Sequence, residues 1–143
     1  MVIGCILMAV TTATHAIAMM AALRWLTFLH DRRRTDAPGW LKACAVASLV
    51  LIMFIVTVVE AAMWAVTFLL LGALSEFEQS LYFSTVTYTT LGYGDVVLVG
   101  RWRLLGAFEA ANGIIMFGWT TALIVTAVKR VYSSPTTTEG QQE

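Results

Sequence analysis

The segment with the clearest chemical potential reads Thr-Thr-Leu-Gly-Tyr-Gly-Asp, at residues 89–95, between two long apolar stretches. A dehydrated cation needs several ligands, and hard cations prefer carbonyl and hydroxyl oxygen. Backbone carbonyls can all point to one side only if alternate residues take conformations that most side chains disfavour, and Gly92 and Gly94 permit these. The sequence therefore predicts a column of cation ligands made of the Thr90 hydroxyl and the carbonyls of Thr90, Leu91, Gly92 and Tyr93.

A glycine-rich turn between two helices is the alternative interpretation of residues 89–95. A lone Gly-Tyr-Gly would fit such a turn. The two threonines before it and Asp95 after it, between two segments of membrane length, favour the cation site instead.

Composition places the chain among membrane proteins. It is 59% hydrophobic and 13% charged, whereas a soluble domain is about half apolar and about a quarter charged. The formal net charge is zero, so nothing indicates a nucleic-acid partner. Cys5 and Cys44 stand alone in separate apolar segments, which predicts buried free thiols and not a disulfide or a zinc site.

Three stretches are long and apolar enough to cross a bilayer, which takes about 20 residues in a helix. We expect a first membrane helix at residues 1–29, an outer helix at 43–74 and an inner helix at 102–131. Residues 75–90 are too short to span and fit a re-entrant helix. Irregular backbone at membrane depth, as expected at residues 90–95, must be buried in protein or line a water-filled path. The predicted fold class is an all-α membrane protein with three transmembrane helices.

Positive charges predict the orientation of these helices. Loops rich in Lys and Arg stay in the cytoplasm, which places the loop at 30–42 and a disordered polar tail at 132–143 there. The N-terminus and the turn at 96–101 then lie outside, although Arg101 and Arg103 count against the rule. The cytoplasmic cations are His30, Arg32, Arg33, Arg34, Lys42, Lys129 and Arg130.

Two carboxylates lie within the predicted membrane helices. An ionisable group there costs about 2.5–3.5 kcal/mol and usually faces protein or water. Glu60 and Glu109 are therefore expected to face the re-entrant helix, either protonated or hydrogen-bonded to Thr or Tyr hydroxyls. An acid–base pair of a membrane enzyme is the alternative, but no nucleophile or metal cluster accompanies them in the sequence. We expect no enzymatic activity.

The remaining charged groups of the first helix and its loop have simpler interpretations. His15 lies mid-helix and fits a hydrogen-bonded packing residue, with a titrating sensor as the alternative. Arg24 is expected to extend to the lipid headgroups. Arg32 to Arg34 are adjacent and not spaced every third position, so they predict a contact with anionic lipid and not a voltage sensor.

From residue 43 to residue 131 the chain resembles the pore module of tetrameric potassium channels, with Leu91 where valine is commoner. It looks most like small prokaryotic two-helix channels, here preceded by an additional helix. The resemblance implies a potassium-selective channel subunit in the plasma (inner) membrane, with passive flux and no cofactor. K+ would bind at Thr90, Leu91, Gly92 and Tyr93, and Gly94 would complete the filter.

One filter loop per chain has a consequence for assembly. The filter of this family is built from four such loops, so the resemblance implies a homotetramer with four-fold symmetry. The alternative is a non-conducting regulatory or structural subunit of a hetero-oligomeric channel.

The resemblance also assigns residues that support the filter. Asp95 is held in relatives by an aromatic donor on the pore helix, which here is Tyr82, so we expect a hydrogen bond between them, direct or through water. Plain aromatic packing of Tyr82 is the alternative. Val86 replaces a glutamate that some relatives pair with that Asp. Ser75 and Glu78 fit a capping box at the start of the pore helix.

The inner helix carries the family's cavity and gate positions. Gly113 is assigned as a hinge and Gly118 as a site of close packing, although packing alone could explain either glycine. Helical spacing puts Thr121 and Val125 on one face, with Val125 as the predicted constriction. Val97 replaces an aromatic residue, which predicts weak external block by quaternary ammonium. The cavity and gate residues are Gly113, Ile114, Phe117, Gly118, Thr121 and Val125.

Overall fold

The computed structural model describes residues 1–32 and 38–132, and these form four α-helices and one short 3-10 helix. Three α-helices are long and apolar enough to cross a membrane. The predictions for Arg33, Arg34 and residues 133–143 lie outside the described residues. The elements are α1 (Val2–Arg32), α2 (Gly39–Leu70), α3 (Phe77–Tyr88), η1 (Gly100–Trp102) and α4 (Arg103–Tyr132).

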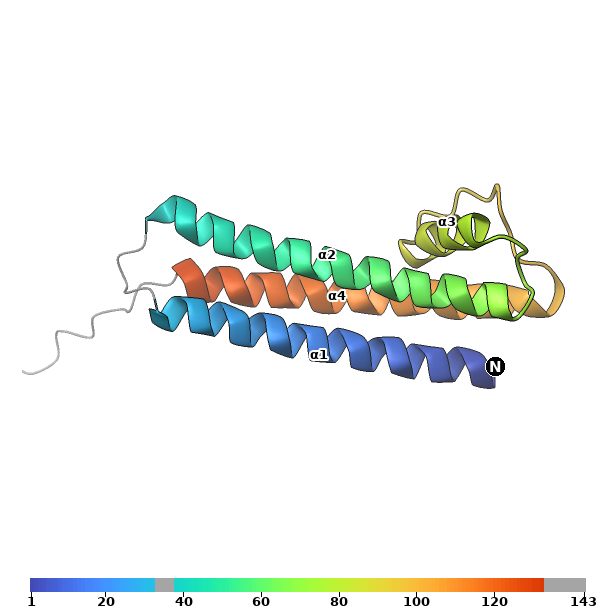
Figure 1. Cartoon of the computed structure of the whole chain (residues 1–143), viewed down its shortest axis with the longest axis horizontal. Helices are drawn as coiled ribbons and strands as arrows, with labels where there is room; N and C mark the ends of the chain where they lie inside the picture. The colour runs from blue at the N-terminus through green and yellow to red at the C-terminus, as the bar shows by residue number, and fades with distance from the viewer. Residues whose placement is uncertain (33–37, 133–143) are drawn as a thin grey trace, which may run out of the picture.

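The long helices α1, α2 and α4 pack side by side, and the short helix α3 packs against α2 and α4 at one end (Figure 1). The N-terminus lies at the same end as α3. The start of α2 and the end of α4 lie at the opposite end. This is the arrangement expected of three successive crossings with α3 and the N-terminus on one side of the membrane.

The outer helix is shifted toward the N-terminus relative to the predicted range of 43–74. It begins at Gly39, directly after Pro38, whose restricted φ and missing N–H suit a helix start. It ends at Leu70, because Gly72 takes a positive φ of 65°. The Ala73 N–H then donates to the Phe68 carbonyl at 2.9 Å, which closes the last turn. Hydropathy does not register this stop signal, and for that reason the predicted helix extended to residue 74.

The pore helix α3 is shorter than the predicted range of 75–90, and the predicted capping box is wrong. Glu76 occupies the N-cap position, with extended backbone and no side-chain cap hydrogen bond. Ser75 therefore lies outside the helix, and Glu78 is only the second helical residue, too early for the box. The helix ends at Tyr88, with Thr89 as its C-cap.

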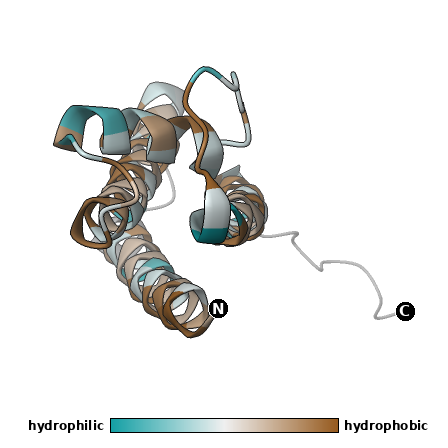
Figure 2. Cartoon of the chain, turned by 90° about the vertical axis from the view of Figure 1, so that its right-hand side faces the viewer, coloured by the Kyte–Doolittle hydropathy of each residue, from teal (hydrophilic) through white to brown (hydrophobic). Residues whose placement is uncertain are grey.

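Two apolar clusters hold the bundle together. One lies beside α3 and includes Trp64, Phe68 and Phe83, with an edge-to-face contact between the two phenylalanines at 5.3 Å. The other joins α1, α2 and α4 through Leu26, Leu49 and their neighbours. Most other apolar side chains point outward, and the hydrophobic colour dominates the long helices (Figure 2).

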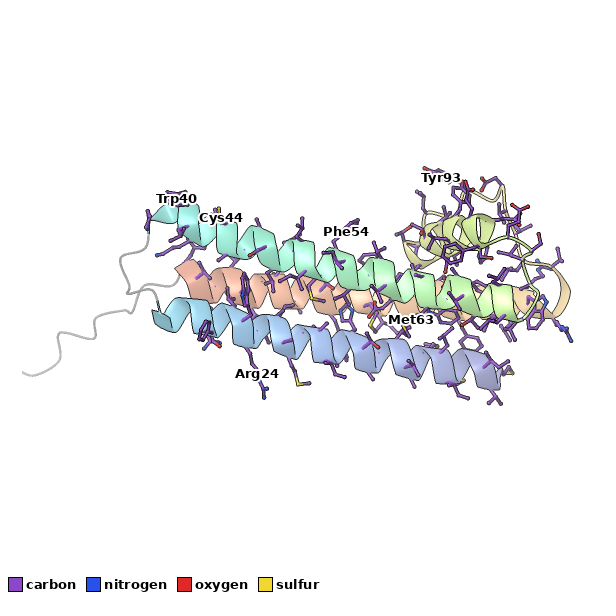
Figure 3. All side chains as sticks on the ribbon, in the orientation of Figure 1. Arg24, Trp40, Cys44, Phe54, Met63 and Tyr93 are labelled. Atoms are coloured by element: carbon purple, nitrogen blue, oxygen red, sulfur yellow. The ribbon has the colours of Figure 1, made fainter. Side chains whose placement is uncertain are left out.

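The two cysteines are free but exposed, so the prediction of buried thiols is wrong. Figure 3 shows Cys44 pointing away from the other helices. Cys5 and Cys44 lie on outward apolar surfaces of α1 and α2. A weakly polar thiol suits such a surface in a membrane helix as well as it suits a protein core.

Candidate ion filter

The backbone after α3 has the alternating conformation that a column of carbonyls requires. Thr90, Gly92 and Gly94 have positive φ values of 59°, 56° and 80°. Leu91 and Tyr93, between them, do not take positive φ. The two glycines were predicted to adopt this conformation, but Thr90 was not. A threonine there is strained, and strain of this kind is characteristic of functional sites.

Carbonyl groups of helix α3 hold the filter segment, residues 90–95, by accepting hydrogen bonds from its N–H groups. The N–H groups of Leu91 and Gly92 both donate to the Val86 carbonyl, at 2.9 and 3.2 Å. The Thr90 N–H donates to the Thr87 carbonyl at 2.9 Å. Val86 thus supports the filter through its main chain, a role that sequence reasoning missed because every residue type has a carbonyl.

The carbonyl oxygens of the filter are left available. Within residues 1–32 and 38–132, the carbonyls of Thr90, Leu91, Gly92 and Tyr93 accept no hydrogen bond from protein. Leu91 and Tyr93 are 56% and 67% exposed, so the segment lies on the surface of a single chain. Tyr93 extends from the outer edge of the molecule in Figure 3. Oxygens without protein donors, on a surface that other chains can approach, are able to ligate a cation.

The predicted hydrogen bond between Tyr82 and Asp95 is present and direct. The Tyr82 hydroxyl donates to Oδ2 of Asp95 at 2.7 Å, which ties the end of the filter segment to α3. This bond, helped by backbone N–H groups, lowers the pKa of Asp95, and it raises the pKa of Tyr82. Plain aromatic packing is therefore not the whole role of Tyr82.

Glu109 faces α3, as predicted, but its partner is a serine. Ser84 lies within hydrogen-bond distance of the Glu109 carboxyl and, at 2.8 Å, of the Ala61 carbonyl. A hydroxyl has one proton, so Ser84 can donate to only one of them. If Glu109 carries a proton it donates to Ser84, and both contacts are satisfied. The other Glu109 oxygen has no protein partner among the described residues.

Glu60 also faces α3 and receives a hydrogen bond of 2.8 Å from the Tyr88 hydroxyl. Its second partner is Nδ1 of His15 on α1, at 3.1 Å from Oε1. His15 is fully buried and hydrogen-bonded, as expected of a packing residue. Its pairing with Glu60 was not predicted. Both are ionisable residues near the middle of apolar helices, and that shared property is the signal that could have suggested it.

Of the two glycines assigned on α4, it is Gly113 and not Gly118 that packs closely within one chain. A Cβ on Gly113 would lie 1.9 Å from the Tyr88 carbonyl oxygen, so Gly113 is the site of close packing. A Cβ on Gly118 would meet no atom within 4 Å, so Gly118 does not serve packing within one chain. The hinge role of Gly113 stays a prediction.

The other assigned cavity and gate residues are exposed on one chain. Ile114 is 61% exposed, Phe117 38% and Val125 47%, and Gly118 and Thr121 are exposed with them. Their spacing puts them on one side of α4. This face is free to line a space between chains.

A family model described as ion channel matches residues 52–130, more than half of the chain. The match covers most of α2, all of α3 and the filter segment, and almost all of α4, and it leaves α1 outside. No curated protein and no solved structure matches the chain. With three helices able to cross a membrane, the chain is an integral membrane protein. The family match covers most of the segment, residues 43–131, that resembles the pore module of potassium channels. The chain belongs to this ion channel family.

Proposed function

We propose that this chain is the subunit of a potassium-selective channel and that four copies form one filter. The observation that supports this most directly is the alternation of positive φ at Thr90, Gly92 and Gly94, beside carbonyls that accept no hydrogen bond from the described part of the protein. One chain supplies one such column. A full set of ligands around an ion on the axis needs several chains, and four is the number this kind of filter uses.

In this proposal, conduction is an exchange of ligands. A K+ ion loses hydration water and gains oxygens from Thr90, Leu91, Gly92 and Tyr93 of each chain. Several ions in the column repel one another, so each remains bound only briefly. K+ is the permeant ion, and the flux is passive and needs no cofactor.

The proposed orientation places the filter and the N-terminus outside the plasma membrane and the C-terminus in the cytoplasm. The supporting observation is the distribution of charge along the bundle. Lys42 near the start of α2 and Lys129 and Arg130 near the end of α4 lie at the end opposite α3. Basic residues concentrate on the cytoplasmic side.

The test is ion flux from liposomes that contain the purified chain, with K+, Rb+ and Na+ compared. We expect flux of K+ and Rb+ without Na+. The matched control is Gly92→Ala, which strains a position with positive φ without meeting any neighbouring atom. That variant should lose selectivity while still forming a helical membrane protein.

Two other outcomes would contradict the proposal. Equal flux of Na+ and K+ through the unmodified chain would mean that the filter does not select. No flux at any pH or voltage would favour the non-conducting subunit of a hetero-oligomeric channel. Assembly with a second, different pore chain should then restore flux.

A further inference from the structure

A chain of hydrogen bonds, buried except at its Thr120 end, joins all four α-helices. On α4, Thr120 Oγ1 lies 3.2 Å from Nε2 of His15 on α1. His15 Nδ1 lies 3.1 Å from Oε1 of Glu60 on α2, and the Tyr88 hydroxyl on α3 donates to Oε2 of Glu60 at 2.8 Å. His15, Glu60 and Tyr88 are each fully buried.

Glu60 requires a partner from α1. A buried carboxylate is strongly unfavourable unless both of its oxygens are hydrogen-bonded. The Tyr88 hydroxyl satisfies Oε2, and within the described part of the chain the hydrogen-bond partner of Oε1 is Nδ1 of His15. With the proton on Nδ1, the opposite ring nitrogen accepts from Thr120, so the ring orientation is fixed at both ends. The family match begins after residue 51, so it includes Glu60 and Tyr88 but not His15.

Tyr88 is the residue through which this chain of contacts reaches the filter. It is the last residue of α3, two positions before Thr90. Its hydroxyl is held by Glu60, and its carbonyl lies so close to Gly113 that a Cβ there would be 1.9 Å away. Tyr88 is thus fixed at its side chain and at its backbone, and Thr90, the first filter ligand, follows it directly after Thr89.

We propose that His15 is a positioning residue for the filter. Helix α1 then does more than anchor the chain, because it supplies the second hydrogen bond that keeps Glu60 on the Tyr88 hydroxyl. The inference rests on the proposed channel function. A binding site must hold its groups within about 0.5 Å of the productive geometry. The filter oxygens must therefore be held closely in place if the filter is to distinguish one ion from another. Loss of His15 therefore acts on selectivity and not only on folding.

The test compares variants of the full chain in liposomes. Each variant is first shown to form an assembly of the same mass as the unmodified protein. His15→Leu removes both ring nitrogens and keeps a side chain of similar bulk. Tyr88→Phe removes only the hydroxyl. His15→Asn keeps a donor near the position of Nδ1 but loses the contact with Thr120. The control is Thr11→Val, one turn away on α1, which breaks a different interhelical bond, the 2.7 Å contact from Asn112.

We expect His15→Leu and Tyr88→Phe each to raise the ratio of Na+ to K+ flux about two- to tenfold, as the loss of one net hydrogen bond predicts. The double variant should be no worse than the worse single variant, because both remove the same link. His15→Asn should recover most of the selectivity. Thr11→Val should keep the unmodified ratio.

Several results would overturn the inference while leaving the channel function intact. They are unchanged selectivity in an assembled His15→Leu, additive effects in the double variant, or an equal loss in Thr11→Val. If His15→Leu does not assemble, the result for Tyr88→Phe decides the question. A ratio of Na+ to K+ flux in Tyr88→Phe equal to that of the unmodified chain then overturns the inference. Failure of the unmodified chain to select K+ would instead overturn the proposed function itself.

Discussion

At the scale of single residues, the bond between Tyr82 and Asp95 gives the filter, in the proposed orientation, a defined response to external acid. The hydrogen bond from Tyr82 lowers the pKa of Asp95 below its ordinary value of 3.8. A carboxylate with a lowered pKa contributes stability that is fully present above the ordinary value and is lost as the pH falls through the lowered one. The tie between the filter and α3 should therefore survive mild acid on the outside.

We predict that K+ flux stays constant as the external pH falls from 7 to about 5. In Tyr82→Phe the tie is absent at every pH, so flux should already be reduced at pH 7, and further acid should have less effect through Asp95 than in the unmodified chain. The measurement is flux against external pH in liposomes. Asp95→Asn is the control and should show no acid response from this position. Equal flux at pH 7 in Tyr82→Phe and the unmodified chain would contradict the prediction.

For contacts between single residues, prediction from sequence succeeded in some cases and failed in others. Tyr82 and Asp95 are 13 positions apart, and their contact was predicted from the resemblance to the channel family. His15 and Glu60 are 45 positions apart on different helices, and no local sequence pattern indicates their contact. Thr90 shows a third case, because its strained backbone depends on what surrounds the filter and not on its own propensity.

At the scale of elements, three long helices were predicted because each is an apolar run of membrane length. Their exact ends depend on stop signals that hydropathy does not register, such as Pro38 before α2 and Gly72 after it. The contact between α3 and α4 is a further feature of this scale. It depends on the missing side chain of Gly113, which lets the Tyr88 carbonyl approach the helix.

We predict that Gly113→Ala prevents α4 from packing on α3. The new Cβ would lie 1.9 Å from a backbone oxygen that cannot move aside as a side chain could. Overpacking of this kind costs about 1–3 kcal/mol or more. The measurement is thermal unfolding of the detergent-solubilised chain. Gly118→Ala is the matched control, because its Cβ meets no atom within 4 Å of the same chain.

The same pair of variants separates packing from hinge bending. If Gly113 acts only as a hinge, Gly113→Ala should be as stable as the unmodified protein and should differ only in flux. Equal stability of the two alanine variants would therefore contradict the packing role. A stable Gly118→Ala beside an unstable Gly113→Ala would support it.

At the scale of the whole molecule, the single chain exposes the surfaces on which its proposed function depends. The filter segment and the face of α4 that includes Ile114 and Val125 are both open. The buried polar contacts lie elsewhere, between α3 and the long helices and among the long helices themselves. In each chain, α3 thus supports one side of the filter segment, and the other side is exposed. Such a surface is suited to meet copies of itself around an axis.

We predict that this assembly is stabilised by K+ and not by Na+. An ion that binds only the assembled filter stabilises it by mass action, about 2.7 kcal/mol at an ion concentration of 100 Kd. The chain in detergent should have the mass of a tetramer, and its unfolding temperature should rise with K+ at constant ionic strength. Gly92→Ala should assemble without the K+ effect, since its strained position lies within the ligand column. Equal stabilisation by Na+, or a monomer at every K+ concentration, would contradict a selective filter formed by four chains.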